Sequence, residues 1–315
     1  MSWHPFAVAA ALATSLTGAG AQAPPPPDPS VEVLAIDRER YQRMTVPVTI
    51  QGQGPFNFLI DTGAQATVLS RALADRLMLH DRDTATLVGM ASSRTVETTP
   101  IDDFNLGSRS FYIRQAPVVE GEHIGDADGI LGLDSLQNQR VLLDFARREI
   151  SVADSETSGG TRGYEIVVRA RERLGQLIIT TARLDGVQVE VIVDTGAQGS
   201  VGNLALLDRL RRNKELVGTE MTDVNGITLG GVVRVARQLE LGRANVQNFP
   251  ILFADSRPFH SLGLADKPAL ILGMSELKLF RRVAIDFKTR RVLFDLPANA
   301  VAFRGFVSDS TSTGT

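Results

Sequence analysis

The chain has 315 residues, of which 43% are hydrophobic and 22% charged, a composition typical of a globular protein with room for two lobes and two cores. Its net charge of −3 provides no electrostatic basis for binding nucleic acid or an anionic membrane. The absence of cysteine excludes disulfides, thiol catalysis, lipoprotein anchoring and cysteine-ligated metal.

Residues 1–21 resemble a secretory signal peptide. An apolar run from Phe6 to Leu16 is followed by Ala19-Gly20-Ala21, a small-x-small cleavage site, although no Lys or Arg precedes the run. The run is too short to span a bilayer as an uncleaved anchor helix, and no other segment approaches membrane length. We therefore expect cleavage near Ala21 and a periplasmic or secreted protein without a stable membrane anchor. A Pro-rich leader over residues 22–43 is a spacer or a segment removed on maturation.

A first lobe is expected over residues 44–154, and its central feature is Asp61-Thr62-Gly63-Ala64. The Gly allows a tight turn after the Asp, so a carboxylate is presented where a buried strand ends. The segment Ser70–Leu79 is typical of a short helix, with Ser70 as N-cap and leucines on one face. Strand-like runs precede these features at Val31–Ile36, Val46–Ile50 and Phe56–Ile60.

A hairpin is predicted next, from strands at Thr86–Met90 and Arg94–Thr98 joined by Ala91-Ser92-Ser93. The small residues at its tip do not distinguish a functional hairpin from a plain surface hairpin. Asp126-Ala127-Asp128-Gly129 suggests a calcium loop, but the third acidic ligand and the terminal Glu are missing. We interpret that stretch as the turn before a strand that begins at Ile130.

The second lobe is expected over residues 164–300, after a Gly- and Ser-rich linker at residues 155–163. It repeats the features of the first lobe in the same order, and the tail at residues 301–315 is rich in Ser, Thr and Gly. The repeated features are an apolar strand at Val189–Val193, the motif Asp194-Thr195-Gly196-Ala197, a helix at Leu204–Leu210, and a hairpin at Met221–Val235 with the turn dipeptide Asn225-Gly226.

The two halves are an internal duplication. One Asp-Thr-Gly is ordinary turn chemistry, but the similarity between the halves extends well beyond it. Coincidence does not preserve the order of several features over more than a hundred residues. The shared features are Gln65 and Gln198, Asp75-Arg76-Leu77 and Asp208-Arg209-Leu210, Ile130-Leu131-Gly132 and Ile271-Leu272-Gly273, and Asp144-Phe145 and Asp286-Phe287, each pair followed by basic residues.

Asp-Thr-Gly-Ala after an apolar strand, with two apolar residues and Gly later in the same unit, resembles the retropepsin-like aspartic proteases. Bacterial exported members of that family carry two such units in one chain, and the resemblance covers roughly residues 44 to 296. It implies a mainly β fold of two pseudo-twofold-related β-barrel lobes, each with a short helix, as in pepsin-like acid proteases. It also implies that each predicted hairpin is a flap that closes over the substrate.

The resemblance further implies an aspartic endopeptidase whose catalytic residues are Asp61 and Asp194. Two carboxylates at the pseudo-twofold axis cannot both ionise cheaply, so they share one proton, and the pair activates a water molecule for attack on the peptide carbonyl. Thr62 and Thr195 would brace the two loops, while Gly63 and Gly196 let a substrate backbone approach. The flap candidates are Ala91, Ser92, Ser93, Asn225 and Gly226, and the substrate would be an extended peptide held by main-chain hydrogen bonds.

Two departures from the family pattern affect the site. Gln65 and Gln198 stand where many relatives carry a small hydroxyl residue or Asp, which leaves the neighbouring substrate contacts undefined. Ala64 and Ala197 stand where a Ser or Thr hydroxyl can donate a hydrogen bond to the catalytic carboxylate. Because such a donor stabilises the charged form, its absence should raise the lower apparent pKa of the pair. We therefore expect a pH optimum displaced toward mildly acidic or neutral values.

Two alternatives remain beside the protease. A catalytically silent, exported peptide-binding module would keep the same bilobal cleft, but both motifs are intact here, which favours activity. A structural exported β-protein would not explain the matched order of the repeated features. No metal or other cofactor is expected, because the four histidines are scattered and neither H-E-x-x-H nor G-x-S-x-G occurs. The expected partner is a peptide or protein substrate, with no nucleic acid, and the chain is expected to be a monomer that forms an internal pseudo-dimer.

Overall fold

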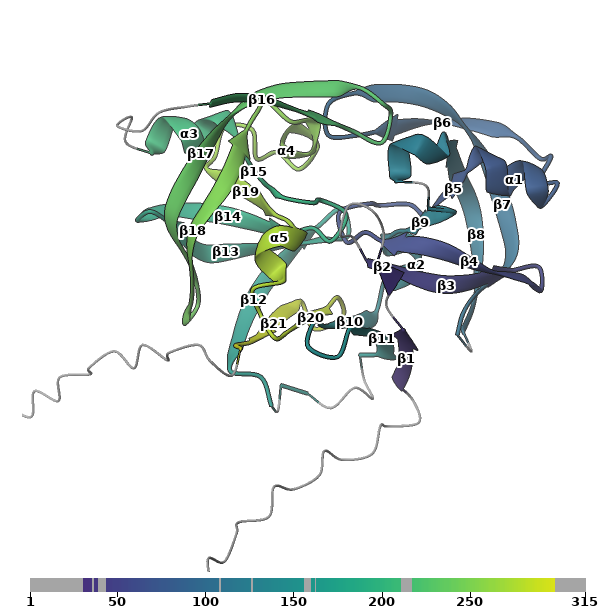
Figure 1. Ribbon diagram of the computed structural model, residues 1–315, viewed down its shortest axis with the longest axis horizontal. Coiled ribbons are helices and arrows are strands. Elements are labelled where there is room, and N and C mark those ends of the chain that lie inside the picture. Colours follow the sequence, from purple (N-terminus) through teal and green to yellow (C-terminus); the bar gives the residue numbers. More distant parts are fainter. Residues whose placement is uncertain are drawn as a thin grey trace, which may run out of the picture.

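The computed structural model describes residues 31–35, 37–38, 44–107, 109–125, 127–155, 160–161, 163–210 and 217–297. The expected signal peptide and C-terminal tail, with part of the linker, lie outside these residues. The described chain is mainly β and forms two lobes that stand side by side above a shared sheet (Figure 1). No helix in this part of the chain is long and apolar enough to cross a membrane.

The first lobe is a closed six-stranded barrel. Alternate side chains of each strand point inward, as in β4, where Phe56 and Phe58 are buried and Asn57 between them is exposed. Phe58 meets Phe104 from the facing strand edge-on, with ring centroids 5.3 Å apart. The strands follow the order β3 (Met44–Ile50), β4 (Gln53–Ile60), β9 (Gly129–Leu131), β5 (Val68–Ser70), β8 (Arg109–Val119) and β7 (Ser93–Leu106), and a pairing between β3 and β7 closes the barrel.

The second lobe repeats this barrel strand for strand. Because each strand has a counterpart in the same position, the duplicated sequence has produced a duplicated fold. The order is β13 (Gln176–Leu184), β14 (Val187–Val193), β19 (Ala269–Leu272), β15 (Ser200–Gly202), β18 (Ala244–Phe253) and β17 (Thr228–Leu241), closed by a pairing between β13 and β17.

One hairpin extends from each barrel over the space between the lobes. In lobe 1 it is formed by β6 (Asp83–Val88) with the start of β7, and in lobe 2 by β16 (Val217–Thr222) with the start of β17. Both hairpins lie at the top of Figure 1. The predicted strands therefore exist, but β7 continues to Leu106 because its second half also forms part of the barrel wall.

The predicted helices are shorter than expected. Ser70 does cap α1 (Arg71–Arg76), accepting a hydrogen bond from the Leu73 amide at 3.2 Å, but the helix ends before Leu79 because Met78 adopts a left-handed conformation with φ of 53°. The counterpart in lobe 2 is α3 (Leu204–Arg209). The remaining short helices are η1 (Gly121–Ile124), α2 (Leu133–Leu136), α4 (Arg257–Ser261) and α5 (Met274–Leu277).

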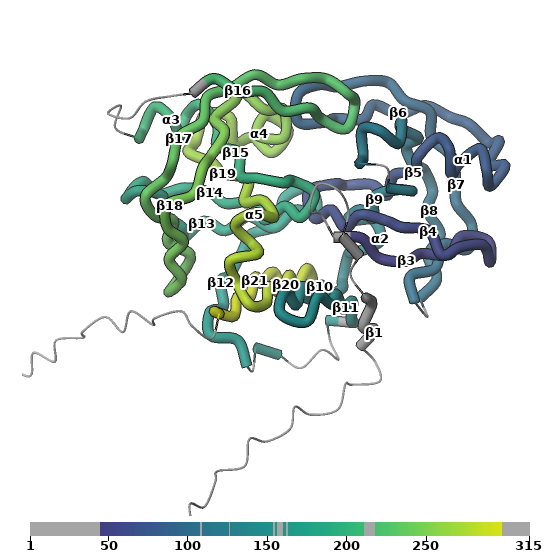
Figure 2. Tube along the Cα trace, viewed as in Figure 1, coloured from purple at the N-terminus to yellow at the C-terminus, as the bar shows by residue number. Residues whose placement is uncertain are grey.

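A six-stranded sheet joins the lobes from below. At its centre β10 (Gln139–Asp144) of the first half pairs antiparallel with β20 (Arg282–Asp286) of the second, and Arg140 on β10 donates to Asp286 on β20 at 2.7 and 3.0 Å. Figure 2 shows the chain passing through this sheet after tracing lobe 1 and returning to it after lobe 2. The outer strands are β11 (Glu149–Asp154) and β1 (Val31–Ala35) on one side, and β21 (Arg291–Asp295) and β12 (Ile166–Arg173) on the other.

The interlobe sheet and the two barrels enclose one continuous hydrophobic core, so neither lobe is packed independently of the other. The strand β1 lies N-terminal to residue 44, at which the first lobe was expected to begin, and a short strand β2 (Asp37–Arg38) pairs with β3. The interlobe sheet and the shared core hold the two lobes next to each other, and this fixes the space between their loops.

Candidate active site

The two Asp-Thr-Gly-Ala loops face each other between the lobes. Asp61 directly follows β4, and Asp194 directly follows β14. The parallel neighbour of each of these strands, β9 for β4 and β19 for β14, tethers the loop. The Asp61 amide donates to Leu131 O, and the Asp194 amide donates to Leu272 O, both at 3.1 Å. The repeated Ile-Leu-Gly segments are thus the strands that hold the aspartate loops.

Thr62 and Thr195 connect the loops through four hydrogen bonds. The Thr62 hydroxyl donates to Val193 O at 2.9 Å and accepts from the Thr195 amide at 3.2 Å. The Thr195 hydroxyl donates to Ile60 O at 2.7 Å and accepts from the Thr62 amide at 3.1 Å. Both side chains are buried, so water does not compete for these bonds. The relative position of the two loops is therefore fixed by reciprocal hydrogen bonds of the two threonine hydroxyls across the pseudo-twofold axis.

Each aspartate lies against the glycine of the opposite loop. A Cβ atom added to Gly63 would lie 2.4 Å from Asp194 Oδ2, and one added to Gly196 would lie 2.2 Å from Asp61 Oδ2. Such distances leave no room for any side chain. The glycines therefore allow the two carboxyl groups to approach each other. Neither glycine has a positive φ, so close approach and not the turn explains the residue type.

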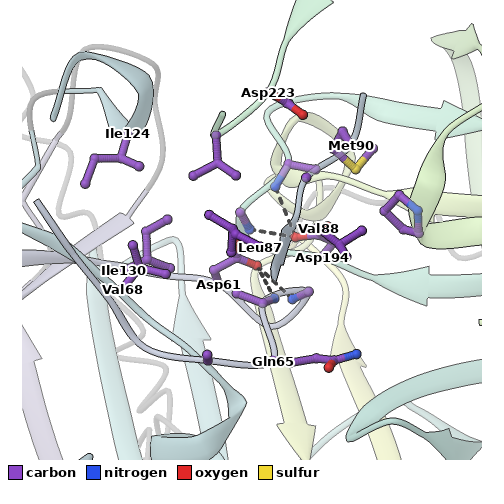
Figure 3. Close-up of a pocket in the computed structure, with 18 of the residues that line it drawn as sticks. Asp61, Gln65, Val68, Leu87, Val88, Met90, Ile124, Ile130, Asp194 and Asp223 are labelled. Atoms are coloured by element: carbon purple, nitrogen blue, oxygen red, sulfur yellow. Dashed lines mark hydrogen bonds between the residues drawn. The ribbon is translucent and has the colours of Figure 1, made fainter. Parts of the chain in front are cut away.

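The carboxyl groups of Asp61 and Asp194 lie close together at the floor of the site (Figure 3). In each loop the inner oxygen, Oδ1, accepts two backbone amides, those of Gly63 and Ala64 for Asp61 and those of Gly196 and Ala197 for Asp194, at 2.8 to 3.1 Å. The Oδ2 oxygens lie next to the glycine of the opposite loop, and both aspartates line the cleft.

The environments of the two aspartates differ. Asp194 is buried, whereas Asp61 is partly exposed. Burial and the neighbouring charge of Asp61 hold the pKa of Asp194 well above its usual range, and the amides of Gly196 and Ala197 only partly oppose that rise. The two carboxyl groups therefore titrate as one coupled pair, in which burial favours the protonated form of Asp194.

A second layer of carboxylates supports the loops from behind. In lobe 1 the Thr67 hydroxyl donates to Asp134 at 2.6 Å and accepts from the Gly132 amide. In lobe 2 the Ser200 hydroxyl takes the same place and donates to Glu276. Burial raises the pKa of Glu276, partly offset by the hydrogen bond from Ser200. Asp134, by contrast, is exposed.

The cleft above the aspartates has a volume of about 1000 Å³. That is at the upper end of the range for small-molecule pockets and suits a longer ligand. Gln65 and Gln198 are exposed along its floor, as is visible for Gln65 in Figure 3. The walls combine polar residues with apolar ones, which include Val68, Ile124 and Ile130 from lobe 1 and Ile192, Leu262 and Ile271 from lobe 2.

The two hairpins form the roof of the cleft. The predicted tip residues Ala91 and Ser92 lie in the turn after β6, whereas Ser93 is the first residue of β7. Asn225 and Gly226 lie in the turn between β16 and β17. The hairpin residues Leu87, Val88, Met90, Met221 and Val224 line the cleft from above. The candidate flap residues of the two lobes are thereby brought together over the aspartates.

Sequence reasoning did not single out the supporting layer of carboxylates, nor three residues of the cleft and its roof. Gln176 is buried and donates its side-chain amide to the Gly63 carbonyl of the opposite lobe. Asp223 contacts the tip of the first hairpin, and Met90 packs against lobe 2. Only Asp223 carried a signal, as an Asp two residues before the turn dipeptide Asn225-Gly226, and that signal indicates a turn and nothing more. Among the described residues, no group of three or more His, Cys, Asp or Glu is placed to hold a metal ion.

Comparison with protein-family models finds a related domain in each lobe. Residues 46–138 match the family model described as gag-polyprotein putative aspartyl protease, and residues 180–275 match the one described as aspartyl protease. No curated protein matches the chain significantly. Each matched region contains one Asp-Thr-Gly-Ala loop and the strand that tethers it.

Proposed function

We propose that this chain, which carries two aspartyl protease domains in tandem, is an aspartic endopeptidase in which Asp61 and Asp194 act on one water molecule. The observation that carries the proposal is the close pair of carboxyl groups, one from each domain, at the floor of a large cleft. One carboxyl group must accept a proton while the other donates one, so neither domain could perform the reaction alone.

We assign the two roles from the difference in burial, with the shared proton on the more buried Asp194 and the negative charge on Asp61. Asp61, the charged and more exposed member, would accept a proton from water as the water oxygen attacks the peptide carbonyl carbon. Asp194, the protonated member, would donate its proton to the carbonyl oxygen, giving a neutral tetrahedral diol. Asp61 would then protonate the leaving nitrogen while Asp194 recovers a proton from one hydroxyl. The products would be a carboxylic acid and an amine, with the proton again on Asp194.

The proposed substrate is a peptide in an extended conformation. The cleft runs between two barrels under two hairpins, and hairpin strands can pair with an extended backbone through main-chain hydrogen bonds. The apolar residues in its walls, such as Ile130 and Ile271, would accept apolar substrate side chains. The expected signal peptide would deliver the enzyme to the periplasm or to the medium, where unfolded polypeptides are accessible substrates.

The test is cleavage of an unbiased peptide library, followed by mass spectrometry, with and without a pepstatin-type inhibitor. The wild type is expected to cleave, and Asp61→Asn and Asp194→Asn are each expected to abolish turnover. The double variant should be hardly worse than either single one, because catalytic partners are not additive. Asp208→Asn, the same change at an exposed position on α3, is the matched control and should retain wild-type activity.

Two outcomes would contradict the proposal. Substantial turnover by either single variant would show that the aspartates do not act as a pair. Library peptides that bind to the wild type but are never cleaved would identify the chain as a catalytically silent peptide-binding module.

A further inference from the structure

The turn of the second hairpin is organised by the side chain of Asp223. Its Oδ1 accepts the amides of Asn225 and Ile227 at 2.9 and 3.0 Å, and its own amide donates to Ile227 O at 2.9 Å. Asp223 is only 4% exposed although it lies at a hairpin tip. A buried carboxylate at such a position requires further partners, because an unpaired buried charge is costly.

Those partners come from the first hairpin. Asp223 Oδ2 accepts the amides of Ala91 and Ser92 at 3.0 and 3.1 Å, and the Ser92 hydroxyl at 2.9 Å. Asn225 adds a bond from its side-chain amide to the Ser92 hydroxyl oxygen at 2.9 Å. The two hairpins, which belong to different lobes, are thus joined tip to tip by one carboxylate with hydrogen bonds to both.

The two hairpins are not equivalent at this contact. Asp223 directly follows β16, and the residue that directly follows β6 is Gly89. A Cβ atom on Gly89 would lie 2.4 Å from Asp223 Oδ2, so the first hairpin provides the space that the carboxylate of the second occupies. The two lobes are otherwise alike, but here the first hairpin has Gly89 and the second has Asp223, and the two residues fit together.

Each tip also docks on the opposite lobe. Met90 O accepts the Arg257 amide at 3.1 Å and the Ser256 hydroxyl at 2.8 Å, and the Met90 side chain packs on a lobe 2 cluster that includes Ile192 and Ile271. Val224 packs on a lobe 1 cluster that includes Val68 and Ile130. The roof is therefore closed along its width, and Figure 3 shows Asp223 and Met90 above the catalytic pair.

We propose that Asp223 is a latch, that is, the residue whose hydrogen bonds to Ala91 and Ser92 hold the two hairpins together over the cleft. A peptide can reach the aspartates from above only when Asp223 releases the first hairpin, and the restored contact then holds the peptide against the catalytic pair. Asp223 is a positioning residue, since it contacts the opposite hairpin and none of the reacting atoms. The inference rests on the proposed protease function for its kinetic consequence, but the latch itself is a physical contact that can be measured without turnover.

Asp223→Asn separates the two roles of the side chain. The Asn oxygen can still accept the turn amides of Asn225 and Ile227, but its NH₂ group would face the donors of Ala91 and Ser92. The turn should survive while the latch fails. Loss of one hydrogen bond to a charged group corresponds to a population change of roughly tenfold or more, so the open state should gain by that factor.

The decisive measurement is the distance between the hairpins. The chain has no cysteine, so spin labels can be attached at Arg94→Cys on β7 and Thr228→Cys on β17, two exposed positions. Pulsed dipolar spectroscopy is expected to give one narrow short distance in the otherwise native sequence and an added longer population with Asp223→Asn. Asp208→Asn is the control with the same charge change and should leave the distance unchanged. An unchanged distance with Asp223→Asn would overturn the proposal.

Two functional experiments follow if the enzyme turns over peptides. Asp223→Asn should raise KM roughly tenfold with little change in kcat, because the latch holds the ground state and the transition state alike. Ser92→Cys combined with Asn225→Cys should form a disulfide across the tips that stops cleavage until a reductant is added. A cross-linked enzyme with full activity would refute the latch. If the wild type cleaves nothing, the proposed function fails, and the label distance alone decides the latch.

Discussion

The exchange of threonine hydroxyls between the loops yields a quantitative prediction for Thr62→Val. Valine matches threonine in shape but lacks the hydroxyl. Thr62 is only 3% exposed, and its hydroxyl makes two hydrogen bonds. Its loss leaves Val193 O and the Thr195 amide without these partners in a buried site. Each buried group left unsatisfied costs about 1–3 kcal/mol, so the variant should lose about 2–6 kcal/mol of the free energy of unfolding.

Urea unfolding followed by far-ultraviolet circular dichroism measures this loss. The single tryptophan, Trp3, lies in the expected signal peptide, so tryptophan fluorescence would not report on the mature protein. Because one buried core runs through both lobes, we expect a single transition whose midpoint falls in the variant while its slope is unchanged. Turnover should also fall, since the loops that carry the aspartates lose part of their alignment.

Two controls make the test specific. Thr62→Ser keeps the hydroxyl and should retain most of the stability, whereas Thr95→Val makes the same substitution at an exposed position on β7 and should change it little. A loss of less than about 1 kcal/mol for Thr62→Val, or an equal loss for Thr62→Ser, would refute the argument that the hydroxyl exchange aligns the loops.

Three further predictions follow from the pKa of buried groups and from the N-terminus. Burial raises the folded-state pKa of Glu276, so stability present at low pH should be lost as pH rises above about 4.5. Glu276→Gln should therefore become more stable relative to wild type across that window in pH-dependent unfolding, with Glu165→Gln, the same change at an exposed position, as the control. The pH optimum of peptidase activity should be mildly acidic to neutral, and Ala64→Ser with Ala197→Ser should move the acid limb downward; a wild-type optimum at about pH 2–3 would contradict this. N-terminal sequencing of the native protein should give Gln22 or a neighbouring residue, and an intact Met1 on most molecules would refute export with cleavage.

Local patterns in the sequence determined the elements of this protein. The apolar runs before Asp61 and Asp194, the glycines after them and the helix cap at Ser70 act over a few residues, so their outcome can be predicted without knowing the fold. Comparison of the halves then indicated a duplicated, mainly β architecture of two lobes with one aspartate each. The end of α1 was missed because the left-handed conformation at Met78 has no local signal as strong as a glycine.

Tertiary structure alone decided the features that depend on residues distant in the chain. The two lobes share their motifs, yet only Asp194 is buried, and only the second hairpin carries a carboxylate at the position that is Gly89 in the first. Burial and hydrogen bonding are properties of the folded surroundings, and Asp223 acquires its role from amides more than 130 residues away. Identical motifs therefore predicted a symmetric pair, and the packing around them made the pair asymmetric.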